Sequence, residues 1–183
     1  MKLDPGDEII HEFNSIRENP KGYASKVEDL IKNIQPNPEP KKGQNFVYVQ
    51  DKVPKTMLHK GEEAFREMVG ILNTMKPLNK LEIKKDLSIE VSENSKDWSN
   101  KDAIAVLVNK KKDELKDKYS NFGFHYDMGT SIPDVSAVLQ LVDDNVGFAG
   151  LRRKNILNEG YKYIGVGYNK EKTKYCFYFL FAS

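Results

Sequence analysis

The closing stretches YKYIGVGYN, residues 161–169, and TKYCFYFLFAS, residues 173–183, decide the fold. Both are rich in aromatic and β-branched residues and are joined by a polar turn around Lys-Glu-Lys, a pattern typical of two antiparallel strands. Two glycines at alternate positions, Gly165 and Gly167, would allow another part of the chain to pack closely on the sheet face. The sequence therefore predicts that the chain ends in a β-hairpin.

Helical patterns fill most of the chain before this hairpin. Pro20, with Asn19 as a cap, divides the first helical pattern into two helices. Apolar residues at helical spacing predict helices within residues 6–34, 59–75 and 132–144, with one or two more in 84–120. Residues 122–131 are predicted to be an irregular connection. Helices come first and strands cluster late, so the predicted fold class is α+β with an antiparallel sheet, in a single domain over residues 1–183.

Residues 35–60 form a proline-containing insertion in this order of elements. The segment contains four prolines and the apolar residues Phe46, Val47 and Val49. It is longer than most loops of compact domains, and side chains held on such a loop are natural anchors for a partner. The alternative is that FVYV folds back as an edge strand over the core of its own domain.

Composition and charge exclude several function classes. The net charge is +2, from 29 basic and 27 acidic residues, and a nucleic-acid partner is not expected from so small an excess. The longest apolar run, YCFYFLFA, is too short for a transmembrane segment. The opening MKLDPGDEIIHEF has no apolar leader, and the single cysteine, Cys176, cannot form an intrachain disulfide. These features predict a cytoplasmic protein with Cys176 as a small core residue.

General catalytic motifs are scarce. The chain has no glycine-rich phosphate loop and no metal-ligand spacing, and its three histidines, His11, His59 and His125, lie far apart in sequence. On pattern alone, neither a cofactor nor a metal is expected.

Four stretches in order carry a family resemblance. They are FNSIRENPKGYASKVEDLI (13–31), KGEEAFREMVGILNTMKPLNKLEIKKDLSIEVSENSKDW (60–98), VSAVLQLVDDNV (135–146), and RRKNILNEGYKYIGVGY (152–168) with YCFYFLFA (175–182). Their order resembles the CAP superfamily (cysteine-rich secretory proteins, antigen 5 and pathogenesis-related 1), especially forms from unicellular eukaryotes. The resemblance implies an α–β–α sandwich with a small antiparallel sheet between helical layers.

The resemblance also implies a cleft, which the family usually builds from two histidines and two acidic residues that can hold a divalent metal. In this chain the place of the first histidine falls on Asn94, and that of the second on Arg152, or on Leu151 with another placement of a one-residue insertion. The family's glutamate is replaced by Phe124, beside His125.

Two acidic residues, Asp143 and Asp144, remain at this degenerate cleft. Acidic residues without histidines do not rebuild the site, and His125 is expected to be a satisfied or exposed histidine. No metal and no catalysis are therefore expected there.

The Arg-x-Asn-Ile-Leu turn keeps its structural residues. Arg153 and Asn155 are predicted to fix the turn through backbone hydrogen bonds, and Ile156 and Leu157 to lie in the core. These roles are structural and need no ligand.

Two functions from different classes follow. The first is a non-catalytic structural or interaction domain that binds proteins of a larger intracellular assembly, such as the cytoskeleton or a ciliary axoneme. The alternative is a lipid- or sterol-binding protein, which the resemblance implies and which the apolar helix faces would allow. A metal-dependent hydrolase is the least favoured.

Overall fold

The computed structural model describes residues 4–89, 101–130, 132–144, 150–171 and 174–183. The helices are α1 (Pro5–Glu18), α2 (Pro20–Asp29), α3 (Glu62–Thr74), α4 (Lys101–Leu115), α5 (Pro133–Val142) and α6 (Leu151–Ile156), with short 3₁₀ turns η1 (Ile31–Asn33) and η2 (Lys85–Leu87). The strands are β1 (Ile34–Pro36), β2 (Phe46–Gln50), β3 (Val53–Leu58), β4 (Glu82–Ile83), β5 (Gly123–Thr130), β6 (Tyr163–Glu171) and β7 (Lys174–Ala182).

Local capping explains why the first helical pattern is two helices. Asp4 accepts a hydrogen bond from the backbone N–H of Gly6 (2.9 Å), and Asn19 accepts one from Gly22 (3.0 Å). A proline occupies the first position of both α1 and α2, where a helix does not need the missing N–H. The predicted division at Asn19 and Pro20 is confirmed.

The C-terminal hairpin is confirmed, and it lies at the centre of a four-stranded sheet in the order β4-β6-β7-β5. β6 and β7 are antiparallel, with Gly165 opposite Leu180, while the short β4 runs parallel to β6. The prediction that residues 122–131 are irregular was wrong for residues 123–130, which form strand β5 antiparallel to β7. His125 and Asp127 are polar residues on the core side of that strand, so the usual alternation of apolar and polar residues is absent from its sequence.

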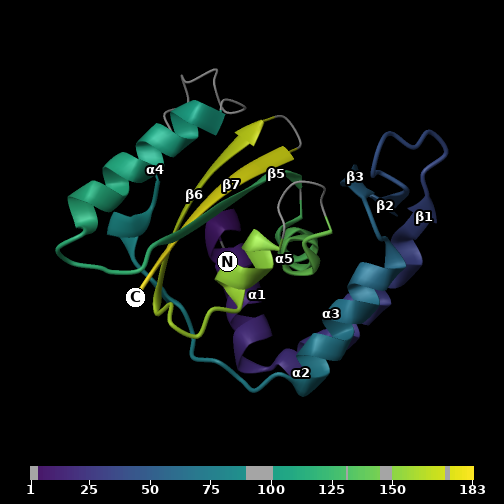
Figure 1. The fold of residues 1–183 in the computed structure, drawn as a ribbon, viewed down its shortest axis with the longest axis horizontal. Coiled ribbons are helices and arrows are strands. Elements are labelled where there is room, and N and C mark those ends of the chain that lie inside the picture. Colours follow the sequence, from purple (N-terminus) through teal and green to yellow (C-terminus); the bar gives the residue numbers. More distant parts are fainter. Residues whose placement is uncertain (1–3, 90–100, 131, 145–149, 172–173) are drawn as a thin grey trace.

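Helices cover both faces of this sheet, which makes the molecule an α+β sandwich (Figure 1). On one face, α1 and α5 pack together and contribute Phe13, Val138 and their neighbours to the larger core cluster. On the other face, Ile104 and Val108 of α4 join Tyr178 and Leu180 of β7 in a second cluster. The hairpin strands therefore have an apolar layer on each side.

The insertion at residues 35–60 is itself folded. β2 is the central strand of a second, antiparallel sheet in the order β1-β2-β3, which lies beside the ends of α2 and α3 (Figure 1). Tyr48 stacks on Phe65 of α3, with ring centroids 6.4 Å apart and planes 6° apart. FVYV thus folds over the core of its own domain, as the alternative expected, but in a central strand and not at an edge.

No described helix is both long and apolar enough to cross a membrane.

Candidate functional site

A continuous run of buried hydrogen bonds joins β5, α5 and α6. Ser136 Oγ donates to Asp127 Oδ2 (2.6 Å), and Gln140 Nε2 donates to Ser136 Oγ (2.9 Å). His125 Nε2 lies 2.8 Å from Gln140 Oε1, and Asn155 Nδ2 lies 3.3 Å from His125 Nδ1. Because Gln140 Oε1 can only accept, the proton of the neutral imidazole belongs on Nε2, which leaves Nδ1 to accept from Asn155.

The charged end of this run is an ion cluster of Arg152 with Asp127 and Asp143. Arg152 Nε donates to Asp143 Oδ1 (2.7 Å), and the backbone N–H of Arg152 donates to Asp143 Oδ2 (3.0 Å). Arg152 Nη1 lies 3.5 Å from Asp127 Oδ1. The Arg152 and Asp143 side chains are only 2% and 0% exposed. A guanidinium with both carboxylates around it gives these buried anions the counter-ion that burial requires.

His125 is held neutral inside this network. Burial, together with the positive charge of Arg152, lowers its pKa from 6.5 to about 3, against the opposing effect of its hydrogen bond to Gln140. The rings of Phe179 and Phe181 lie 5.0 and 5.3 Å from the imidazole. With both ring nitrogens engaged, His125 is a satisfied core histidine, as the sequence predicted.

Asp144 is the second aspartate at the end of α5 and holds a different partner. Its carboxylate accepts hydrogen bonds from three consecutive backbone N–H groups, those of His59 (3.1 Å), Lys60 (3.0 Å) and Gly61 (2.8 Å). These groups precede α3 and form a nest for an anion. The carboxylate of Asp144 therefore occupies the anion-binding position at the start of α3.

The residues expected at the degenerate cleft do not all come together. Asp143 and Arg152 meet, and His125 lies in the same network. Phe124 points to the other face of the sheet, where its ring lies 6.2 Å from that of Tyr126, and Leu151 is 46% exposed at the start of α6. Asn94 lies outside the described residues.

The Arg-x-Asn-Ile-Leu segment is a short helix, α6, followed by a turn. Ile156 is fully buried and Leu157 packs against the core, as expected. Asn155 donates to the backbone carbonyl of Phe124 (3.1 Å) and so ties α6 to β5. The prediction for Arg153 was wrong, since its guanidinium donates to the side chain of Glu67 on α3 (3.1 Å) and not to the turn.

Arg17, which sequence reasoning missed, supplies the backbone hydrogen bonds of this turn. Its guanidinium is fully buried and donates to the carbonyls of Asn79, Ile156, Asn158 and Tyr161 at 2.7–3.2 Å. Burial of Arg17 lowers its pKa from 12.5 to about 10, so the guanidinium stays charged at neutral pH.

Gly165 and Gly167 lie under the segment Leu87–Ile89. A Cβ on Gly165 would lie 2.2 Å from the backbone carbon of Leu87, and one on Gly167 would lie 1.9 Å from the carbonyl oxygen of Ile89. The glycines thus permit the close packing on the sheet face that their spacing predicted.

Ser136 and Gln140 are further network residues that the sequence analysis missed. They lie four residues apart in VSAVLQLV, an otherwise apolar helix, and both are fully buried. Polar residues at helical spacing on a buried helix are the signal that could have found them.

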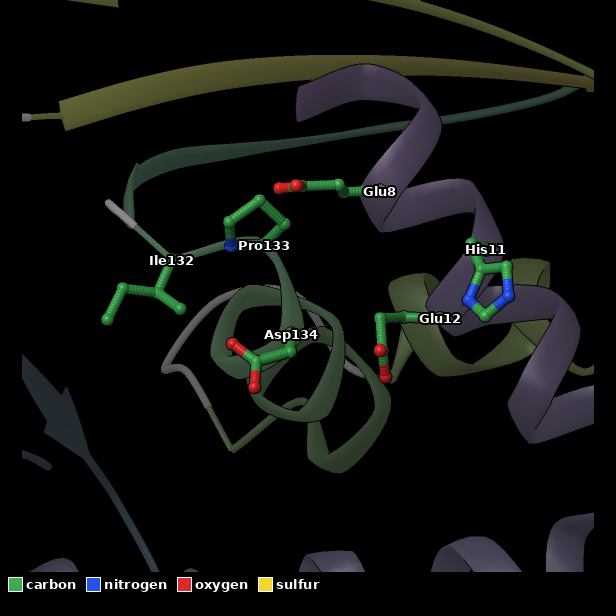
Figure 2. Close-up of a pocket in the computed structure, with 6 residues that line it drawn as sticks. All are labelled: Glu8, His11, Glu12, Ile132, Pro133 and Asp134. Atoms are coloured by element: carbon green, nitrogen blue, oxygen red, sulfur yellow. The ribbon is translucent and has the colours of Figure 1, made fainter. Parts of the chain in front are cut away.

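A separate open pocket of about 320 Å³ lies between α1 and the start of α5 (Figure 2). Glu8, His11 and Glu12 line it from α1, and Ile132, Pro133 and Asp134 line it from α5 and its N-cap. Glu12 already accepts from Tyr23 (2.8 Å) and Lys26 (2.7 Å). In Figure 2 the side chains of Glu8 and Asp134 extend toward the left, whereas that of Glu12 points downward.

No three His, Cys, Asp or Glu side chains in the described part of the chain are grouped so that they could hold a metal ion. Searches against protein-family models, curated proteins and solved structures gave no match.

Proposed function

We propose that this chain is a non-catalytic interaction domain of CAP type within a larger intracellular assembly, such as the cytoskeleton or a ciliary axoneme. The observation that supports this most is the ion cluster, in which Arg152 holds the carboxylates of Asp127 and Asp143 inside the protein. An arginine is a permanent counter-ion because its guanidinium stays protonated in proteins, and it has no lone pair with which to bind a metal.

The rest of the network supports the same proposal. General acid–base chemistry needs a side chain that reaches the substrate with a pKa near the working pH. The pKa of His125 is about 3, and the side chain is 2% exposed and bonded to its neighbours. A satisfied network of this kind instead fixes the relative positions of α5, α6 and β5.

Metal analysis tests the non-catalytic part of the proposal. The purified protein is expected to hold no stoichiometric zinc, because Arg152 already neutralises the carboxylate of Asp143. About one zinc per chain that is lost in His125→Gln or Asp143→Asn would contradict the proposal and favour a metal-dependent enzyme.

Purification from the native cell tests the interaction part. The tagged protein is expected to elute with a defined set of proteins at low salt, and to keep part of that set at high salt. Extraction of the same preparation without detergent tests the alternative, because recovery of one lipid or sterol per chain would favour a carrier.

The structure changes which residues of the insertion can face a partner. Val47 is 5% exposed, and Phe46 packs against Gly61, where a Cβ would lie 2.6 Å from the ring. Replacing Phe46 and Val47 by serine is therefore expected to lower the melting temperature. Val49 is half-buried on β2, and contact with a partner falls mainly to the exposed residues around it.

A further inference from the structure

The small sheet β1-β2-β3 and its β1–β2 loop expose three lysines, Lys55 on β3 and Lys41 and Lys42 on the loop. We propose that this surface docks an acidic segment of a partner protein, an inference that rests on the proposed interaction function. The surface, called here the basic sheet face, consists of Gln35, Val49, Lys55 and Met57 on the strands, with Lys41 and Lys42 on the loop between β1 and β2.

The strand register separates an inner from an outer face. Gln35, Val47 and Met57 lie opposite one another across the three strands, and successive residues of a strand point to opposite faces. Tyr48 on the inner face is fully buried against α3. On the outer face Met57 is 39% exposed, whereas Val47, between Gln35 and Met57, is 5% exposed. Lys55, two residues before Met57, is exposed on the same side.

The charge of this part of the chain differs from that of the whole. Residues 31–58 contain five lysines, two acidic residues and no arginine, whereas the full chain has a net charge of only +2. Lys41, Lys42 and Lys55 are exposed and form no ion pair with any described residue. Unpaired, like-charged groups repel one another, so an acidic partner would gain attraction and relieve that repulsion.

The loop that presents Lys41 and Lys42 is held in shape before any partner arrives. Asn37 Nδ2 donates to the carbonyl of Gln44 (2.9 Å) and lies 3.7 Å from Met57 Sδ, so the first residue of the loop contacts the outer face. The Nδ1 atom of His59 lies 2.9 Å from the carbonyl oxygen of Gly43. Prolines at 38 and 40 restrict the loop further, so less conformational entropy is lost on binding.

The chemistry of the face favours carboxylates over nucleic acid or phosphate. Phosphate groups are recognised best by the forked donors of arginine, and the segment contains none. Single-stranded nucleic acid needs exposed aromatic rings for stacking, but Phe46 and Tyr48 face inward, Tyr48 with no exposure. Exposed lysines without arginine or an exposed aromatic ring fit a peptide that carries several Asp or Glu residues.

Fluorescence anisotropy with a labelled ten-residue glutamate peptide tests the proposal on the full chain. The triple variant Lys41→Glu/Lys42→Glu/Lys55→Glu is compared with Lys21→Glu/Lys116→Glu/Lys154→Glu. The control changes three other exposed, unpaired lysines and has the same net charge. We expect the first variant to bind at least about tenfold more weakly than the parent and the control to bind within about twofold, at low salt where exposed charges are least screened.

Several results would overturn the proposal. These are an equal loss in the control, no binding of the glutamate peptide by the parent, and tighter binding of single-stranded DNA or phosphatidylserine vesicles than of the peptide. Purification from the native cell separates the two proposals. If the first variant still joins the complex that the parent joins, this docking surface is wrong and the interaction function stands. If the parent joins no complex, the interaction function itself fails.

Discussion

Single residues carry charge into the interior of this protein in two ways. Arg152 is surrounded by carboxylates, and it compensates two buried anions. Arg17 bonds to backbone carbonyls, and it closes the turn after α6. Neither residue is replaceable by lysine without loss, because each uses several donors of the planar guanidinium at once.

Arg152→Ala is predicted to lower the free energy of unfolding by about 3–5 kcal/mol, because it leaves Asp127 and Asp143 buried without their counter-ion. Urea unfolding followed by circular dichroism measures the change. Lys154→Ala, two residues further along α6 and exposed, is the control and should stay within about 0.5 kcal/mol. A loss below about 1 kcal/mol in Arg152→Ala would mean that the cluster contributes little to stability.

His125 is predicted to make the protein less stable as the pH falls from about 6.5 toward 3. In this range the unfolded chain binds a proton at His125, while the folded chain, with its pKa lowered to about 3, does not. This residue alone then adds a slope of up to about 1.4 kcal/mol per pH unit. Urea unfolding of the parent and of His125→Gln at several pH values isolates the contribution of His125 to this slope, because the carboxylates contribute equally to both proteins. Equal slopes in the two proteins would contradict the lowered pKa.

At the scale of elements, the backbone of residues 87–89 lies close against strand β6. This contact defines the layer that covers the α4 side of the larger sheet. The segment Leu87–Ile89 crosses β6 at Gly165 and Gly167, and it brings Leu87 and Ile89 into the second core cluster with α4. The packing of that layer therefore depends on two positions with no side chain.

Gly165→Ala is predicted to destabilise the fold by about 1–3 kcal/mol or more, because the new methyl group would meet the backbone of Leu87 and Ser88. Gly70→Ala is the matched control. Gly70 is exposed within α3 and has no atom within 4 Å of the added Cβ, so alanine there should stabilise by about 0.5–1 kcal/mol. Thermal and urea unfolding measure the change in stability of each variant relative to the parent. A change of the same sign in both variants would refute the packing argument.

At the scale of the whole molecule, Asp144 joins two parts that are far apart in sequence. It lies two residues after the end of α5, which packs on the larger sheet, and its carboxylate lies in the nest before α3, next to the small sheet. The position of the basic sheet face relative to the rest of the molecule thus depends in part on this contact.

Asp144→Ala is predicted to cost about 1–3 kcal/mol, since three backbone N–H groups lose a charged acceptor. Hydrogen exchange should quicken at the amides of His59, Lys60 and Gly61 and remain unchanged in β7. Asp134→Ala removes a half-exposed acid at the start of α5 and should leave those amides as they are. Unaltered exchange at the nest in Asp144→Ala would show that the carboxylate is dispensable.

The sequence by itself determined the features that depend on neighbours along the chain. The break at Asn19 and Pro20, helices α1 to α5 and the C-terminal hairpin follow from caps, prolines and periodicity, and the α+β class follows from their order. Helix α6 does not, since its segment was predicted as a turn. Only the tertiary structure decided what depends on distant neighbours. Strand β5 carries His125 and Asp127 on its core side, and it pairs with β7 because Arg152, Ser136 and Gln140 satisfy those polar groups from other elements. The energy of a buried polar residue depends on its hydrogen-bond partners, and here those partners come from other elements of the chain.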